Sequence, residues 1–83
     1  MAQLDDAVQA YRASLAAVDK AKQAAEERIR AARERAEAAR LALADAMVRA
    51  ALDGTRQRDI IAVTGYSREQ VRTILRAGGV EPE

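Results

Sequence analysis

The side chains most able to do chemistry in this sequence lie close together near its C-terminal end. Arg68 and Arg72 are spaced to share one face of a short helix, and the apolar residues Val71, Ile74 and Leu75 are spaced to share the other. An arginine can donate two hydrogen bonds to guanine, and a neighbouring glutamate can accept one from cytosine. A short helix with an apolar back and an arginine-rich front is therefore suited to the major groove of DNA.

Local signals mark the ends of the helix that carries this face. Ser67 and Gln70 have the spacing of a capping box, which predicts that the helix begins at Ser67. Gly65 supplies the backbone freedom that a tight turn between two helices requires. The pair Gly78 and Gly79 predicts a left-handed cap at the C-terminal end of the helix.

A second short helix is expected before the turn. Thr55 is placed to be its N-cap, and its inward positions are predicted to be Ile60, Ile61 and either Val63 or Thr64. The segment from Thr55 to Leu75 thus predicts two helices joined by a tight turn.

This segment resembles the helix-turn-helix of bacterial DNA-binding proteins, whose pattern is Q-x-x-I-A-x-x-T-G-x-S-x-x-x-V-x-x-I. The matching positions are Gln57, Ile60, Ile61, Thr64, Gly65, Ser67, Val71 and Ile74. The family usually has an alanine four residues before the turn glycine, and this chain has Ile61 there. Either the two helices lie further apart, or the register is shifted by one and Ala62 takes that role.

The resemblance implies two sets of DNA contacts. The residues expected to meet base edges are Arg68, Glu69, Arg72 and Thr73. The residues expected to meet phosphates are Arg56, Gln57, Arg58, Ser67 and Arg76. The simpler interpretation of the arginines is a solvated helix face with Glu69–Arg72 and Asp59–Arg56 ion pairs. Two other functions stay open: a coiled-coil interaction module that docks a protein, and a filament-forming helix with a small helical cap.

The charge of the chain is concentrated on the same segment. Residues 1–53 contain nine basic and nine acidic side chains, which cancel. Residues 54–80 contain five arginines against Asp59 and Glu69, an excess of five minus two, or three positive charges. This location fits a surface that contacts phosphates, and the small excess favours two copies acting together.

The composition argues against several other classes of protein. The chain has no cysteine and no histidine, so disulfides and the commonest catalytic base and nucleophile are missing, and we expect no enzyme, metal or cofactor. No pocket for a small molecule and no membrane span or signal peptide is expected. The expected location is the cytoplasm, in association with the nucleoid.

Residues 2–53 contain no glycine or proline and are rich in alanine, which predicts one long helix that Gly54 ends. Apolar or small residues recur in a heptad pattern along it, which predicts a coiled-coil arm. The residues expected to make oligomer contacts are Leu4, Val8, Tyr11, Leu15, Val18, Lys22, Ile29 and Leu43. A hairpin of two helices and a lone solvated helix, held by pairs such as Glu26–Arg30 and Glu37–Arg40, are the alternatives.

Two features of the predicted coiled coil bear on its partner. Lys22 occupies a core position, where it either extends to solvent along its aliphatic stem or selects the register and oligomer state. An antiparallel homodimer is favoured because it places Leu15 beside Ala46, so that a large residue meets a small one, and because it avoids the facing of Arg28 and Arg33 that a parallel pair would impose.

The sequence therefore predicts an all-α protein with two parts. Residues 1–53 form a coiled-coil oligomerisation arm, and residues 54–83 form the helix-turn-helix segment. Residues 41–53 are apolar on more than one side, so they are also expected to be the first helix of a tri-helical unit. The predicted function is sequence-specific binding of double-stranded DNA, in a small transcriptional regulator, a plasmid or phage maintenance protein, or a DNA-organising protein.

Overall fold

The computed structural model describes residues 1–81, which form three α-helices and no strand. These are α1 (Ala2–Leu52), α2 (Gln57–Thr64) and α3 (Arg68–Ala77). The prediction of an all-α protein with a long N-terminal helix and two short helices is confirmed. The predicted helix-turn-helix segment extended to residue 83, so its last two residues lie outside the described part. The chain divides into two compact units, residues 1–35 and the residues from Ala36 onward.

α1 is a single uninterrupted helix, so the alternative of a two-helix hairpin is wrong. It carries Asp5 in its first turn and Arg49 in its last turn, and both charges are favourable to the helix dipole. It ends where Gly54 takes a left-handed conformation, with φ of 102°. The N–H of Thr55 then donates to the carbonyl oxygen of Ala50 over 2.9 Å, which satisfies one of the last carbonyl groups of the helix.

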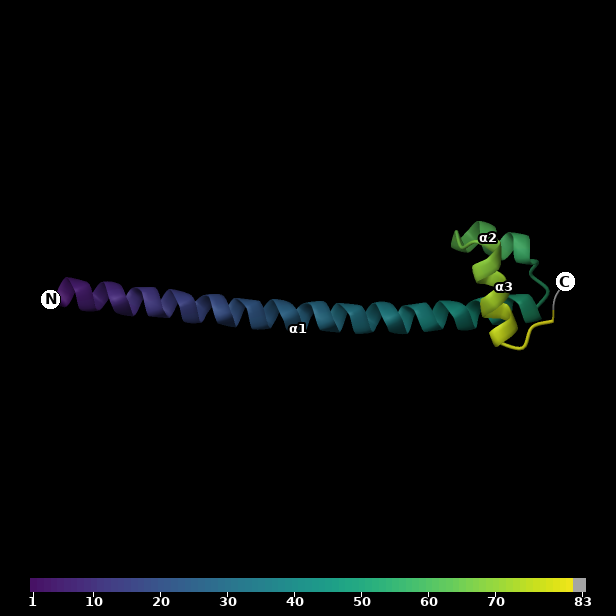
Figure 1. Ribbon diagram of the computed structural model, residues 1–83. Coiled ribbons are helices and arrows are strands. Elements are labelled where there is room, and N and C mark those ends of the chain that lie inside the picture. The colour runs from purple at the N-terminus through teal and green to yellow at the C-terminus, as the bar shows by residue number, and fades with distance from the viewer. Residues whose placement is uncertain (82–83) are drawn as a thin grey trace. The chain divides into compact units, whose positions relative to one another are not determined.

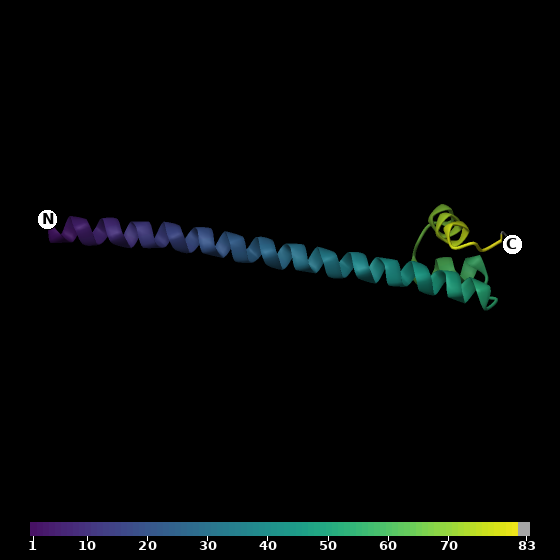
Figure 2. The ribbon, with the colours of Figure 1, turned by 90° about the horizontal axis from the view of Figure 1, so that it is seen from below.

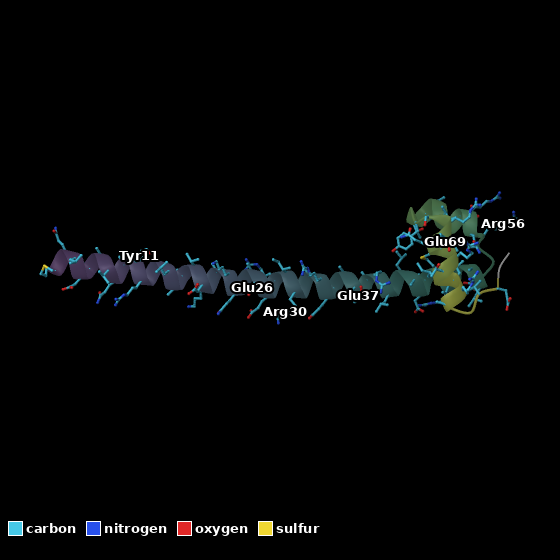
Figure 3. The ribbon with its side chains drawn as sticks, viewed as in Figure 1. Tyr11, Glu26, Arg30, Glu37, Arg56 and Glu69 are labelled. Carbon is cyan, nitrogen blue, oxygen red and sulfur yellow. The ribbon has the colours of Figure 1, made fainter. Side chains whose placement is uncertain are left out.

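The first unit consists of residues 1–35 of α1, and its side chains are almost all exposed. Figure 3 shows Tyr11, Glu26 and Arg30 projecting from this part of the helix. The predicted core positions of the coiled coil include several large apolar side chains that the single chain leaves exposed: Leu4, Val8, Tyr11, Leu15, Val18 and Ile29. Glu26 and Arg30, both within the described residues, do not form the expected ion pair.

The second unit has a small apolar core to which all three helices contribute. Its buried residues are Met47 of α1, Ile60 of α2, and Val71 and Leu75 of α3. Val48 and Ala51 of α1 are partly buried against them. The end of the long helix therefore packs with α2 and α3 around one small core. α3 runs across the last turns of α1, and α2 lies beside both (Figures 1 and 2).

The start of α2 differs from the prediction, because Arg56 and not Thr55 is its N-cap. The N–H of Thr55 closes the end of α1, and the first carbonyl oxygen to accept a hydrogen bond of α2 is that of the next residue, Arg56. Arg56 has an extended backbone and makes no side-chain capping hydrogen bond. Its carbonyl oxygen accepts from the N–H of Asp59 and of Ile60, at 3.0 and 3.2 Å.

The inward face of α2 settles two alternatives that the sequence left open. Thr64 is half-buried and Val63 is 88% exposed, so Thr64 is the inward residue. Ile61 is partly buried against the core and Ala62 is exposed. The register is therefore the one expected without a shift, and Ile61 takes the place of the usual alanine.

α3 has the ends that the sequence predicted. The Ser67 hydroxyl accepts from the N–H of Gln70 over 3.1 Å, and the Gln70 side chain accepts from the N–H of Ser67 over 2.9 Å. At the other end Gly79 is the left-handed residue, with φ of 81°, while Gly78 has φ of −86°. The N–H of Val80 donates to the carbonyl oxygen of Leu75 over 2.9 Å, and Val80 packs against the core. Both ends of α3 are therefore fixed by specific hydrogen bonds. Within residues 1–81, no helix has an apolar stretch long enough to span a membrane.

Candidate nucleic-acid interface

α3 separates its apolar and polar residues as the sequence predicted. Val71 and Leu75 are 0% and 1% exposed, and Ile74 is partly buried beside them. The residues expected to meet DNA from this helix are all exposed: Arg68, Glu69, Arg72, Thr73 and Arg76. Because Arg68, Arg72 and Arg76 are four residues apart, they follow one another along one side of the helix. The buried back fixes the helix in place while the arginines stay accessible.

Glu69 and Arg72 form an ion pair on the exposed side of α3. The two residues are three positions apart, so the pair forms within the helix. This is one of the two pairs that the simpler, solvated interpretation predicted. The other does not form: within the described residues no ion pair joins Asp59 and Arg56.

The turn between α2 and α3 is held by short-range hydrogen bonds. Gly65 has φ of 72°, and its N–H donates to the carbonyl oxygen of Ile61 over 2.9 Å. The Thr64 hydroxyl donates to the carbonyl oxygen of Ile60 over 2.7 Å and accepts from the N–H of Tyr66 over 3.2 Å. Tyr66 packs partly buried against the core. The turn therefore sets the direction in which α3 leaves α2.

The remaining candidates lie at the N-terminal ends of α2 and α3. Arg56 and Arg58 are exposed, and Figure 3 shows Arg56 projecting away from the helices around it. Gln57 is half-buried at the first position of α2 and already has an interaction within the chain. Ser67 is exposed, and its hydroxyl accepts the capping hydrogen bond, which leaves the hydroxyl hydrogen able to donate to a phosphate.

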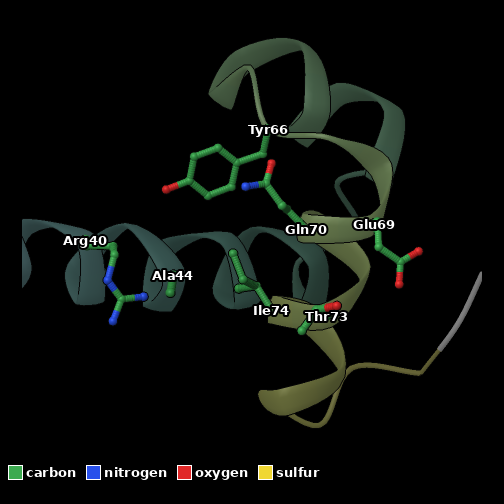
Figure 4. Close-up of a pocket in the computed structure, with 7 residues that line it drawn as sticks. All are labelled: Arg40, Ala44, Tyr66, Glu69, Gln70, Thr73 and Ile74. Atoms are coloured by element: carbon green, nitrogen blue, oxygen red, sulfur yellow. The ribbon is translucent and has the colours of Figure 1, made fainter.

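A hollow of about 320 Å³ lies between α1 and α3 within the second unit. Figure 4 shows Arg40 and Ala44 of α1 on one side of it, with Tyr66 above them and Gln70 and Ile74 opposite. The Arg40 guanidinium donates two hydrogen bonds to the Glu37 carboxylate, at 2.9 and 2.6 Å. These hydrogen bonds lower the pKa of Glu37 and raise the pKa of Arg40.

The sequence placed Arg40 only in ion pairs of the long helix and did not associate it with the predicted DNA-binding face. Its position beside Tyr66 depends on how α3 packs on α1, and the spacing of residues along the chain carries no signal of that packing. The structure thus adds one arginine to the surroundings of α3, although Glu37 already balances its charge.

The second unit brings together all the residues predicted to contact DNA. The predicted oligomer contacts lie in residues 4–29 of the first unit, apart from Leu43, which belongs to the second. Within residues 1–81, no three histidine, cysteine or acidic side chains are grouped so that they could hold a metal ion. No protein-family model, curated protein or solved structure matches this chain.

Proposed function

We propose that this protein is a sequence-specific DNA-binding protein that acts as a homodimer, with α3 as the helix that enters the major groove. The observation that carries the proposal is the division of α3 into a buried apolar back and an exposed front with three arginines. A helix that is capped at both ends and anchored on a core keeps its front in a defined position. Such a helix can hold side chains at the distances that base recognition requires.

Each polar residue of α3 has a role that follows from its chemistry. Arg72 can donate to N7 and O6 of a guanine, and Glu69 beside it can accept from N4 of a cytosine. The two side chains form an ion pair in the single chain, so both would have to leave it to contact bases. Arg68 and Thr73 are the other two candidates for base edges, and Arg76 is better placed for a phosphate.

The start of α2 and the start of α3 would hold the protein on the DNA backbone. Arg56 and Arg58 are exposed at the start of α2, and Ser67 is exposed at the start of α3. Gln57 is half-buried, so its share of the phosphate contact would come from a partly covered side chain. These contacts position a protein on DNA without reading the sequence.

Dimer formation is proposed because one copy offers little charge and much uncovered apolar surface. The excess of three positive charges in residues 54–80 predicts weak binding by one copy. The exposed apolar residues of the first unit follow the heptad pattern, and a second helix would cover them. Two joined copies would bind two adjacent sites with a higher total affinity. A protein of this kind would act in the cytoplasm on the DNA of the nucleoid.

The proposal is tested by measuring the affinity of the full chain for duplex DNA at several salt concentrations. A preferred site would first be selected from a pool of random duplexes. Arg72→Ala is expected to cost about 1–3 kcal/mol on that site and to relax the sequence preference. Arg76→Ala is expected to lower the affinity for all DNA sequences similarly. It should also reduce the slope of log affinity against log salt concentration by about one.

Arg30→Ala is the matched control, because it removes the same charge from the first unit and should leave DNA affinity unchanged. Circular dichroism would verify that each variant is folded. If Arg72→Ala and Arg76→Ala both bind DNA as tightly as the unmodified chain, the DNA-binding proposal is wrong.

A second candidate function is a coiled-coil module that docks a protein through its helix-turn-helix unit. The apolar groove between α1 and α2, which Val63 borders, favours it, because an apolar groove on the surface is suited to an apolar element of a protein partner. The two functions differ in one simple measurement: a protein-docking module would show no salt-dependent binding to random duplex DNA.

A further inference from the structure

An apolar groove of about 200 Å³ lies between α1 and α2, entirely within the second unit. Its α1 side is formed by Leu43, Ala46, Met47 and Ala50. Its α2 side includes Ile60 and Val63. Val63 is 88% exposed at the edge of this groove, so its side chain extends the apolar surface of the groove. The groove therefore has the properties of a surface that another apolar element covers.

Of the α1 residues that line this groove, Leu43, Ala46 and Ala50 are also core positions of the heptad pattern, and Met47 is not. Leu43 and Ala50 occupy the first core position of the heptad, and Ala46 occupies the second. Met47, the residue that follows the second core position, is buried toward α2 and α3. α2 therefore lies next to the line of heptad core residues on α1, on the side where Met47 is. A second helix that packed along these core residues would enter the groove.

We infer that the groove receives residues 8–18 of a second copy of this chain, which runs antiparallel to the first. This inference rests on the homodimer of the proposed function and extends its contact surface from α1 onto α2. The segment 8–18 contains Val8, Tyr11, Leu15 and Val18, all of them exposed in the single chain.

The sizes of the facing side chains fit this arrangement. In the antiparallel register, Leu15 of the second copy lies beside Ala46 and Tyr11 of the second copy lies beside Ala50. Large side chains thus enter the groove where its floor is lined by alanine. Leu43 faces Val18 of the second copy at the other end, where both side chains are exposed in the single chain.

The charges that border the groove also match this occupant. In an antiparallel pair, the residue directly after the second core position of one helix faces the equivalent residue of the other helix. In the occupying helix these residues are Arg12, after Tyr11, and Asp19, after Val18. Arg12 of the second copy comes beside Met47 and therefore close to Asp59, which lines the groove on α2. Asp19 of the second copy comes beside Arg40. Each contact pairs a positive with a negative side chain.

The occupied groove would give the second unit the support that its own core lacks. Within residues 1–81, only Met47, Ile60, Val71 and Leu75 are buried in the single chain. A unit of this size with so few buried residues is marginal. The second copy would add apolar contacts to both α1 and α2. Self-association and the positioning of the DNA-binding helix would then be linked.

The test compares Val63→Asp with Ala62→Asp by sedimentation of the full chain over a range of concentrations. Both changes add one negative charge at neighbouring exposed positions of α2, and only Val63 lines the groove. Val63→Asp is expected to raise the dimer dissociation constant by at least about a hundredfold, because each dimer would desolvate two carboxylates. Ala62→Asp is expected to leave it unchanged.

Two further variants test the register and the charge contact. Oxidation of a Leu15→Cys/Ala46→Cys chain should give disulfide-linked dimers, and Ala46→Cys alone should not. Asp59→Arg should weaken the dimer, and the double change Arg12→Asp/Asp59→Arg should restore it.

The inference is overturned if Val63→Asp associates as tightly as Ala62→Asp, if Ala46→Cys alone is efficiently crosslinked, or if the unmodified chain is a monomer at every concentration. In the last case the groove would bind a different protein and not a second copy of this chain. DNA affinity is measured separately. If DNA binding depends on Arg72 and Arg76 but self-association does not depend on Val63, the proposed DNA binding stands and this inference is wrong.

Discussion

Gly78 lies at the end of α3, directly against Val48 of α1, and alanine at this position should destabilise the second unit. A Cβ atom added at Gly78 would lie 2.4 Å from Cγ2 and 2.9 Å from Cγ1 of Val48. The backbone of Gly78 has φ of −86°, which alanine adopts without strain. The expected effect is therefore purely steric and comes from one neighbour.

The magnitude follows from two opposing contributions. Overpacking of a well-filled site costs roughly 1–3 kcal/mol, and Val48 cannot turn aside easily because a β-branched side chain in a helix strongly prefers one rotamer. The loss of flexibility in the unfolded chain stabilises an alanine variant by roughly 0.4–1 kcal/mol. The net result should be a decrease of about 1–2 kcal/mol in the free energy of unfolding.

Denaturant unfolding of the full chain, followed by circular dichroism, measures this decrease. Val48→Ala removes both methyl groups that would clash, so Gly78→Ala should cost almost nothing in that background. Gly79→Ala is the matched control. Its added Cβ meets no atom within 4 Å, and its φ of 81° imposes a backbone cost of roughly 1–2 kcal/mol that Val48→Ala cannot relieve. A Gly78→Ala chain as stable as the unmodified protein, or an equal penalty in both backgrounds, would refute the packing of α3 on α1.

Three other outcomes are expected. Ser67→Ala removes the capping hydrogen bond to Gln70 and should lower the free energy of unfolding by about 1 kcal/mol, measured by the same denaturant titration; an unchanged value would contradict the capping box. NMR titration should find the pKa of Glu37 below its ordinary value, and Arg40→Gln should raise it again. Any stability from this exposed pair is therefore present above the pKa that Glu37 has in the unfolded chain, and it is lost as the pH falls through the pKa of Glu37 in the folded chain. Lys22→Ile should raise the melting temperature by extending the apolar stripe, and a decrease would place Lys22 on the surface of the assembled protein.

The sequence was sufficient wherever structure depends on neighbours along the chain. The capping box of Ser67 and Gln70, the left-handed turn at Gly65 and the buried side of α3 are all decided by residues a few positions apart. The end of the long helix at Gly54 is of the same kind. Hydrogen bonds within one turn and the 3.6-residue period determine these features, and both can be read from residue types and spacing.

The errors and gaps arose where two elements compete or meet. Thr55 has the right side chain for an N-cap, but the residue whose carbonyl oxygen accepts the first hydrogen bonds of α2 is Arg56. Val63 and Thr64 are adjacent in sequence, and only the packing of α2 shows which of them faces inward. A local pattern does not show which of two neighbouring residues caps a helix. It also does not show which of two neighbouring sides of a short helix faces the core.

The candidate DNA-binding residues were identified from the sequence because charge and periodicity coincide on α3. The surroundings of that helix were decided by tertiary structure alone: Arg40 beside Tyr66, the absent Cβ of Gly78 against Val48, and the groove bordered by Val63. Each of these joins residues of α1 to residues of α2, of α3 or of the turn between them. Their proximity depends on the angle at which α2 and α3 pack on α1, and that angle is determined by the shapes of Met47, Ile60, Val71 and Leu75 in the core together.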